Sequence, residues 1–102
     1  MTTKQALTDI DSPDEFEDLT KDEQTILLNW CASVFTQIKT INTKHTSYGL
    51  KHIFENTPEG FYVSNGQFKG AMLKSGFISN NVETENNCYF NISEKSPILK
   101  KD

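Results

Sequence analysis

The sequence predicts an α+β fold led by helices, in which three main helices precede a small C-terminal β-hairpin in a winged-helix-like order. Three Ser/Thr-x-x-Glu/Gln motifs, of the kind that caps the first turn of a helix, divide the chain at residues 12–15, 20–23 and 64–67. Apolar residues recur at helical spacing after these motifs, whereas short aromatic and β-branched runs nearer the C-terminus are typical of strands. A chain of 102 residues is expected to form one domain.

The first 19 residues are predicted to form an acidic arm, partly disordered or holding one short helix, ahead of a single globular domain at residues 20–102. Negative charge is concentrated at this end: residues 1–30 hold eight carboxylates and two lysines, a net charge of −6, although the whole chain carries −4. Ser12 and Pro13 suit the cap and the first position of a short helical turn that would include Phe16 and Leu19.

The second capping motif is expected to open the longest helix, from Thr20 to about Ile41. Its apolar residues recur at steps of three and four and would cover about half of the helix circumference, more than the usual apolar stripe. They are Ile26, Leu27, Trp30, Cys31, Val34, Phe35, Ile38 and Ile41. This helix is therefore expected to be the spine of the core, or to be buried on two sides with a homodimer partner covering the second.

Two shorter helices are expected next. The first of them would run from Thr46 or Ser47 to about Asn56, where a Pro- and Gly-containing turn stops it. The other would begin after Ser64 and end at Gly76, whose position before a phenylalanine is typical of a Schellman turn.

A strand is expected at residues 88–92, paired either with residues 77–78 or with residues 61–63. Helices followed by a hairpin are the layout of helix-turn-helix proteins with a wing. The nine residues that would separate the last two helices are nevertheless more than the three or four of a typical helix-turn-helix turn.

The residues indicate no enzyme activity, no cofactor and no metal site. The two histidines, His45 and His52, stand next to no recognisable nucleophile motif, and neither Cys31 nor Cys88 lies in a basic context that would lower a thiol pKa. These four side chains also lack the close pairing of zinc ligands. The wide cysteine spacing favours two free thiols over a disulfide.

Membrane association is not expected. No apolar run approaches the roughly 20 residues of a membrane-spanning helix, and the first residues show no basic-then-apolar signal pattern. The sequence therefore predicts a cytoplasmic protein.

One candidate surface is a set of basic, polar and stacking side chains on the last two predicted helices and in the connection before them, suited to nucleic acid. Lysines would contact phosphates, and their neighbours would hydrogen-bond or stack. The set is Lys44, Tyr48, Lys51, Gln67, Lys69 and Lys74. The chain has no arginine, the side chain that best reads guanine, and the acidic arm would repel DNA unless it folds away.

The other candidate surface is a flat strip on the third predicted helix. With Phe68 and Met72 facing inward, Gly66, Gly70 and Leu73 would face outward, and two glycines four residues apart would let a neighbour approach the helix backbone closely. That neighbour could be the first helix of the same chain, a protein partner or a nucleic-acid backbone.

The acidic arm could also dock a partner. Phe16, with other large apolar residues among the carboxylates, would fit a basic groove on another protein, although such arms more often serve only as a solubilising segment.

Several runs in the second half of the chain resemble small, mostly uncharacterised proteins of phages and integrative elements of Gram-positive bacteria. They are residues 46–52, 60–73, 75–77 and 87–93. The resemblance implies a mobile-element origin and a bacterial cytoplasmic setting, and it brings no established activity or site residues.

Two functional hypotheses follow. The first is a non-enzymatic nucleic-acid-binding accessory or regulatory protein of a phage or mobile element, and the predicted fold favours it. The alternative is a protein-interaction module or inhibitor of a host protein, acting through the acidic arm or through the Gly66/Gly70 helix face.

Overall fold

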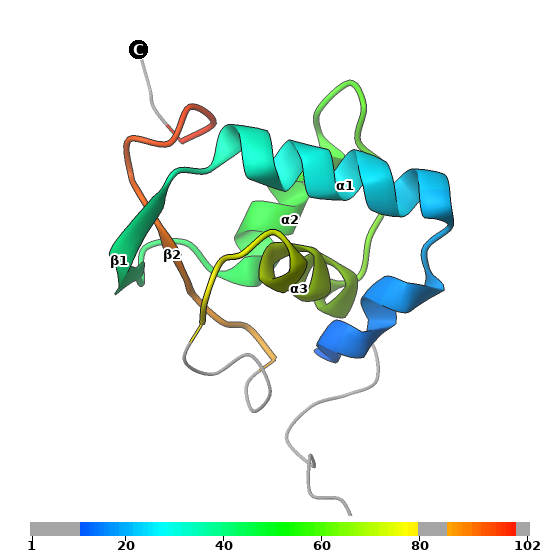
Figure 1. Ribbon diagram of the computed structural model, residues 1–102, viewed down its shortest axis with the longest axis horizontal. Helices are drawn as coiled ribbons and strands as arrows, with labels where there is room; N and C mark the ends of the chain where they lie inside the picture. Colours follow the sequence, from blue (N-terminus) through cyan, green and yellow to red (C-terminus); the bar gives the residue numbers. More distant parts are fainter. Residues whose placement is uncertain (1–10, 80–85, 100–102) are drawn as a thin grey trace, which may run out of the picture.

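A computed structural model of the chain describes residues 11–79 and 86–99, and the fold is α+β, as predicted. The elements are a 3₁₀ helix η2 (Pro13–Asp18), helix α1 (Lys21–Val34), strand β1 (Gln37–Asn42), helix α2 (Ser47–Glu55), helix α3 (Asn65–Lys74) and strand β2 (Phe90–Ile92). Helix α1 runs along one side of the molecule, with η2 below its first turn and the two strands at its other end (Figure 1).

Helix α1 begins as predicted and ends seven residues earlier than the predicted Ile41. At its start, the Glu23 N–H donates to Thr20 Oγ1 (3.1 Å) and the Thr20 N–H donates to Glu23 Oε1 (3.0 Å). After Val34 the chain becomes strand β1, which contains three β-branched residues, Ile38, Thr40 and Ile41, a residue type that favours strands. Ile38 and Ile41 thus lie outside the helix, and the wide apolar face that motivated a homodimer is shorter than expected.

Strands β1 and β2 form a two-stranded antiparallel sheet in which Gln37 lies opposite Ile92 and Asn42 lies opposite Phe90, with an irregularity between them. The predicted C-terminal hairpin is therefore wrong, because β2 pairs with a strand that precedes two helices. Residues 61–63 are irregular. Residue Ile78 does lie beside β2, since the Asn91 N–H donates to its carbonyl (3.2 Å).

The predictions for α2 and α3 are confirmed. Thr46 caps α2, and both bonds of the predicted capping box form between Ser64 and Gln67 at the start of α3. At the end of α3 the Phe77 N–H donates to the Met72 carbonyl (3.1 Å), and the Gly76 N–H donates to the Leu73 carbonyl (3.0 Å). These are the two bonds of a Schellman turn, and the φ of +97° at Gly76 explains why glycine stands there.

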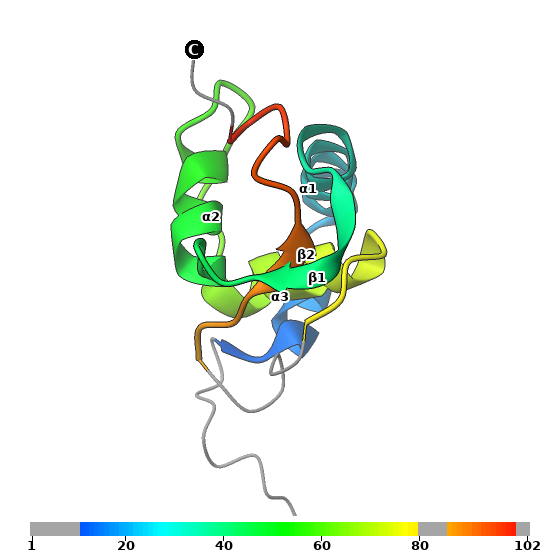
Figure 2. The ribbon, with the colours of Figure 1, turned by 90° about the vertical axis from the view of Figure 1, so that its left-hand side faces the viewer.

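The core lies between the three helices, η2 and β2, and in the view of Figure 2 strand β2 runs between α2 and α1. Trp30 makes edge-to-face contacts with Phe35 (5.4 Å between ring centroids) and Phe54 (5.1 Å), which joins α1 to α2. Cys31 and Cys88 are free, as predicted, and both are fully buried. Burial raises the pKa of both thiols, so neither is a ready nucleophile.

Residues 11–19 belong to the globular domain, which corrects the predicted boundary at residue 19. Phe16 and Leu19 are 1% and 8% exposed and lie in the core, and η2 packs along α3. A Cβ added at Gly70 would lie 2.4 Å from the Pro13 carbonyl oxygen and 2.5 Å from Phe16 Cβ. The absence of a side chain at Gly70 therefore lets η2 rest directly on the backbone of α3.

Replacement of Gly70 tests this packing. Gly70→Ala should destabilise the domain by about 1–3 kcal/mol, because the new methyl group meets backbone and cannot be accommodated without a shift. Gly49→Ala in α2 is the matched control: its Cβ would make an ordinary 3.4 Å contact, and alanine favours the helix by up to about 1 kcal/mol. Urea unfolding midpoints measure both, and equal stability of the two variants would contradict the packing.

Candidate functional site

Two tyrosines are the most exposed aromatic side chains in the described part of the chain. Tyr62 is 72% exposed and Tyr48 is 50% exposed. Tyr48 lies on the first turn of α2, and Tyr62 lies in the irregular segment that connects α2 to α3. With His52, which is also exposed on α2, they form a surface that we call the tyrosine face.

The ammonium group of Lys51 lies beneath the surface and contacts the rings of both tyrosines. Lys51 Nζ lies 5.2 Å from the ring centroid of Tyr48 and 4.9 Å from that of Tyr62, distances at which a cation is attracted to an aromatic ring. The residue is only 4% exposed, and its Nζ donates to Glu55 Oε2 (3.0 Å). The lysine therefore braces the tyrosine face and is not itself a surface cation.

Glu55 ties this bracing to the backbone. Its Oε2 also accepts from the Val63 N–H (3.0 Å), and its Oε1 lies 3.1 Å from His52 Nδ1. The His52 ring makes an edge-to-face contact with Tyr48 at 4.4 Å between centroids. Desolvation alone would raise the pKa of Glu55. The pKa nevertheless lies below its ordinary value, because the carboxylate is stabilised by the Val63 N–H, the Lys51 ammonium group and His52.

The residues predicted to contact nucleic acid do not form one surface. Lys44, Tyr48 and Lys74 are exposed, whereas Gln67 is half-buried and forms part of the cap of α3. Their predicted companions Lys51 and Lys69 are 4% and 0% exposed, which corrects the expectation that both present an ammonium group to solvent.

Lys69 and Asn65 instead hold the segment ahead of η2. Lys69 Nζ donates to the Asp11 carbonyl oxygen (2.9 Å), and Asn65 Nδ2 donates to Asp11 Oδ1 (2.9 Å). A lysine is almost never fully buried without a partner, and the Asp11 carbonyl oxygen is a partner for the Lys69 ammonium group. Asp11 belongs to the segment that the sequence predicted to be an acidic arm, so this part of the segment is fixed to α3.

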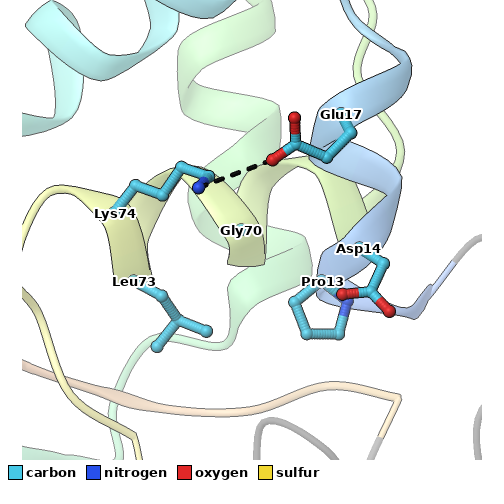
Figure 3. A pocket seen from close by; sticks show the side chains of 6 residues that line it. All are labelled: Pro13, Asp14, Glu17, Gly70, Leu73 and Lys74. Atoms are coloured by element: carbon cyan, nitrogen blue, oxygen red, sulfur yellow. Dashed lines mark ion pairs between the residues drawn. The ribbon is translucent and has the colours of Figure 1, made fainter.

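The predicted partner-binding strip is covered by the chain itself. Gly66 and Gly70 are buried, Phe16 packs on the helix, and Leu73 is half-buried. Of the neighbours proposed for the strip, an element of the same chain is the one present, and it is η2 rather than the long helix. What remains open is a shallow cavity of about 200 Å³, rimmed by Asp14, Glu17 and Lys74 (Figure 3).

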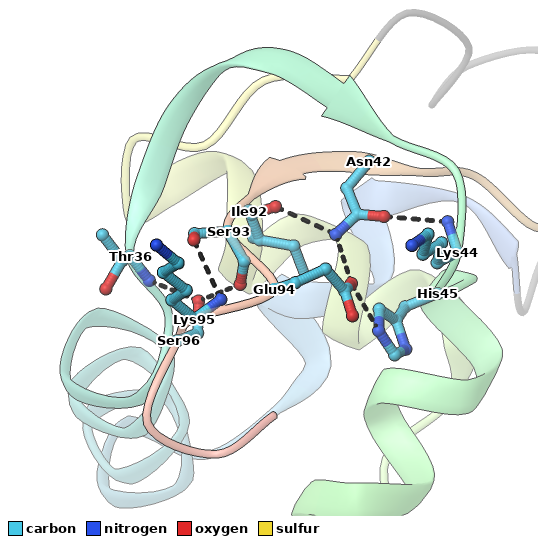
Figure 4. A network of polar contacts seen from close by, with 9 residues as sticks. All are labelled: Thr36, Asn42, Lys44, His45, Ile92, Ser93, Glu94, Lys95 and Ser96. Atoms are coloured by element: carbon cyan, nitrogen blue, oxygen red, sulfur yellow. Dashed lines mark hydrogen bonds and ion pairs between the residues drawn. The ribbon is translucent and has the colours of Figure 1, made fainter. Parts of the chain in front are cut away.

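A second polar cluster joins the sheet to the start of α2 (Figure 4). His45 Nε2 lies 2.7 Å from Glu94 Oε2, which also accepts from Asn42 Nδ2 (2.6 Å). Asn42 in turn donates to the Ile92 carbonyl (3.0 Å) and accepts from the Lys44 N–H (2.8 Å). The Asn42 bond, aided by His45, lowers the pKa of Glu94. Since each group is engaged with its neighbours, the cluster closes the β1–α2 turn.

Within residues 11–79 and 86–99, no three His, Cys, Asp or Glu side chains come together as a metal site would require. No helix of the same ranges is long and apolar enough to cross a bilayer. Comparisons with protein-family models, with curated proteins and with solved structures found no match to this chain.

Sequence reasoning found Tyr48 and missed Tyr62. Residues 61–63 were expected to form a strand, in which Phe61 and Val63 would share the face opposite Tyr62. That alternation survives in the irregular segment, because Phe61 and Val63 turn inward while Tyr62 faces solvent. The sequence signal for the exposure of Tyr62 was therefore its position between two apolar residues, Phe61 and Val63, that face the opposite side.

The bracing of the tyrosine face predicts a pH-dependent loss of stability. Glu55→Gln should lower the free energy of unfolding by about 2 kcal/mol at neutral pH, because Lys51 and Val63 lose a charged acceptor. The pKa of Glu55 is lowered from 4.5, so its contribution is complete above that pH and is lost as pH falls through the lower folded value.

Unfolding by urea between about pH 7 and pH 3 measures this dependence. Glu59→Gln, an exposed carboxylate of the neighbouring turn, is the charge-matched control and should have little effect. A stability difference between wild type and Glu55→Gln that stays constant down to the lowest pH would contradict the assigned role.

Proposed function

We propose that this chain is a non-enzymatic protein-interaction module that binds its partner through the tyrosine face. The observation that carries the proposal is the pair of exposed tyrosines, Tyr48 and Tyr62, which both contact the buried ammonium group of Lys51. Tyrosine is among the residues that most often dominate the binding energy of protein interfaces. A ring already held in place loses little conformational freedom on binding, so more of its contact energy becomes affinity.

The charges around the tyrosine face also favour a protein ligand. Lys51 is paired with Glu55, so the two most central charged groups cancel, and Lys51 is buried. A nucleic-acid ligand would need several unpaired cations at the surface to neutralise phosphates. The acidic residues of η2 are a weaker candidate interface, because Phe16, their apolar anchor, already lies in the core of the domain.

A second candidate function is the nucleic-acid-binding accessory or regulatory role in a phage or mobile element. The order helix, strand, helix, helix, followed by residue Ile78 beside β2, supports a winged-helix-like arrangement, although the sheet holds two strands. Lys44 and Tyr48 are exposed at the start of α2, and the pairing of a cation with a ring suits a stacked base and its phosphate.

The tyrosine face is tested by a double substitution. Tyr48→Ala with Tyr62→Ala should weaken capture of a protein partner by about 30-fold or more, the size expected for loss of a hot spot. Capture from a bacterial extract by the immobilised full chain, followed by titration of the purified captured protein, measures the loss. The thermal unfolding midpoint should change little, because both rings are largely solvated.

Ile78→Ala is the control, since Ile78 is a large apolar side chain, 54% exposed, on another part of the surface. Capture that survives the tyrosine substitutions but fails in the control would remove the tyrosine face from consideration. Steeply salt-dependent binding of single-stranded DNA that requires Lys44 and Tyr48 would instead favour the second candidate function.

A further inference from the structure

The contact between α3 and residues 11–18 has a consistent polarity. Lys69 Nζ donates to the Asp11 carbonyl oxygen, Asn65 Nδ2 donates to Asp11 Oδ1, and Lys74 Nζ lies 3.4 Å from Glu17 Oε2. In all three contacts the helix supplies the hydrogen-bond donor and residues 11–18 supply the oxygen. An acidic segment thus covers a helix face that presents donors and positive charge.

The shape of the covered surface matches this polarity. Gly70 allows the Pro13 carbonyl and Phe16 Cβ to sit against the backbone of α3, where any larger residue would hold them away. A phosphodiester backbone has the same two properties as the segment now in place, since it is negatively charged and presents only acceptor oxygens there.

We propose that the face of α3 formed by Asn65, Lys69, Gly70 and Lys74 (the covered face) binds a nucleic-acid phosphodiester backbone, and that residues 11–18 are an internal competitor for it. In the conformation described here the competitor is bound. The proposal is independent of the tyrosine face; it rests on the second candidate function, which it supplies with a site and a means of control.

The start of α1 does not depend on the competitor, although Phe16 of this segment packs in the core. Residues 11–18 join α1 through Leu19 and Thr20, and the capping box of α1 is closed locally between Thr20 and Glu23. Phe16 is the apolar anchor of the segment, at 1% exposure. A ligand that needs the uncovered state binds with an apparent affinity reduced by the fraction of molecules that are uncovered.

Phe16→Ala in the full chain tests the proposal, because it removes the anchor and leaves every charge in place. Its affinity for a short mixed-sequence DNA duplex, measured by fluorescence anisotropy, should be at least about tenfold tighter than that of the wild type. With two lysines on the covered face, affinity should fall about tenfold between roughly 50 and 200 mM salt. Adding Lys74→Gln should reduce the salt slope by about 1.

If Phe16→Ala does not fold, two charge-matched variants test whether residues 11–18 compete for the covered face. Glu17→Gln and Asp18→Asn each remove one exposed carboxylate from η2, but only Glu17 contacts Lys74 in the described structure. Glu17→Gln should bind the duplex more tightly than Asp18→Asn, whereas equal affinities would overturn the proposal.

Two other results would also overturn it. One is a folded Phe16→Ala that binds the duplex no better than the wild type. The other is a folded Phe16→Ala that binds a synthetic peptide of residues 11–19 but not the duplex, which would assign the covered face to acidic protein segments. If the wild type and Phe16→Ala bind the duplex with equal affinity, and this binding depends on Lys44, the internal competitor is rejected. The second candidate function would then still stand.

Discussion

The close contact between η2 and the backbone of α3 at Gly70 determines which surfaces this domain can use. It requires a residue without a side chain at one position of the helix, and it brings Phe16 into the core and the Asp11 carbonyl to Lys69. Helix α3 is consequently buried along most of its length, and the groups that could have formed a basic surface on it are satisfied within the chain. Under the proposed function, a partner would contact the outer side of α2 and the segment before α3, where Tyr48 and Tyr62 are exposed.

That outer side owes its order to a polar network rather than to apolar packing alone. Lys51 and Glu55 lie one turn apart on α2, and each has a second role: the lysine contacts two tyrosine rings, and the carboxylate accepts from the Val63 N–H. Because Lys51 is only 4% exposed, the loss of Glu55 would leave a buried ammonium group without its charged partner. The same groups that fix the loop before α3 therefore also fix the orientation of the exposed rings.

The local elements could be predicted from the sequence because their signals are local. Capping motifs at Thr20 and Ser64 and the glycine at 76 each specify bonds within a few residues, and those bonds form. The partner of β2 could not be predicted, because strand pairing across two intervening helices depends on how the helices pack. Ile38 and Ile41 continue a helical spacing by coincidence, and the pairing of their strand, β1, with β2 outweighs that spacing.

In the candidate sites, too, local features could be predicted from the sequence and those that depend on tertiary packing could not. Lysine is usually exposed, so the sequence placed Lys51 and Lys69 on the surface, and only the tertiary structure shows the carboxylate and the carbonyl that compensate their burial. The two glycines of α3 did indicate a close neighbour, but their spacing carries no information about which segment that neighbour is. Tyr48 could be selected from the sequence as an aromatic residue close to lysines. Tyr62 could not, because its exposure depends on which side of residues 61–63 faces solvent.

The central claim, that residues 11–18 cover α3 and bury Lys69, is tested most directly by the rate at which each lysine amine reacts with a soluble acylating reagent. Mass spectrometry of the intact, folded chain after brief labelling would report each site separately. The structure predicts that Lys69 reacts far more slowly than the exposed Lys44 and Lys74, and that unfolding removes the difference. Reaction of Lys69 at the rate of Lys44 in the folded chain would contradict the account.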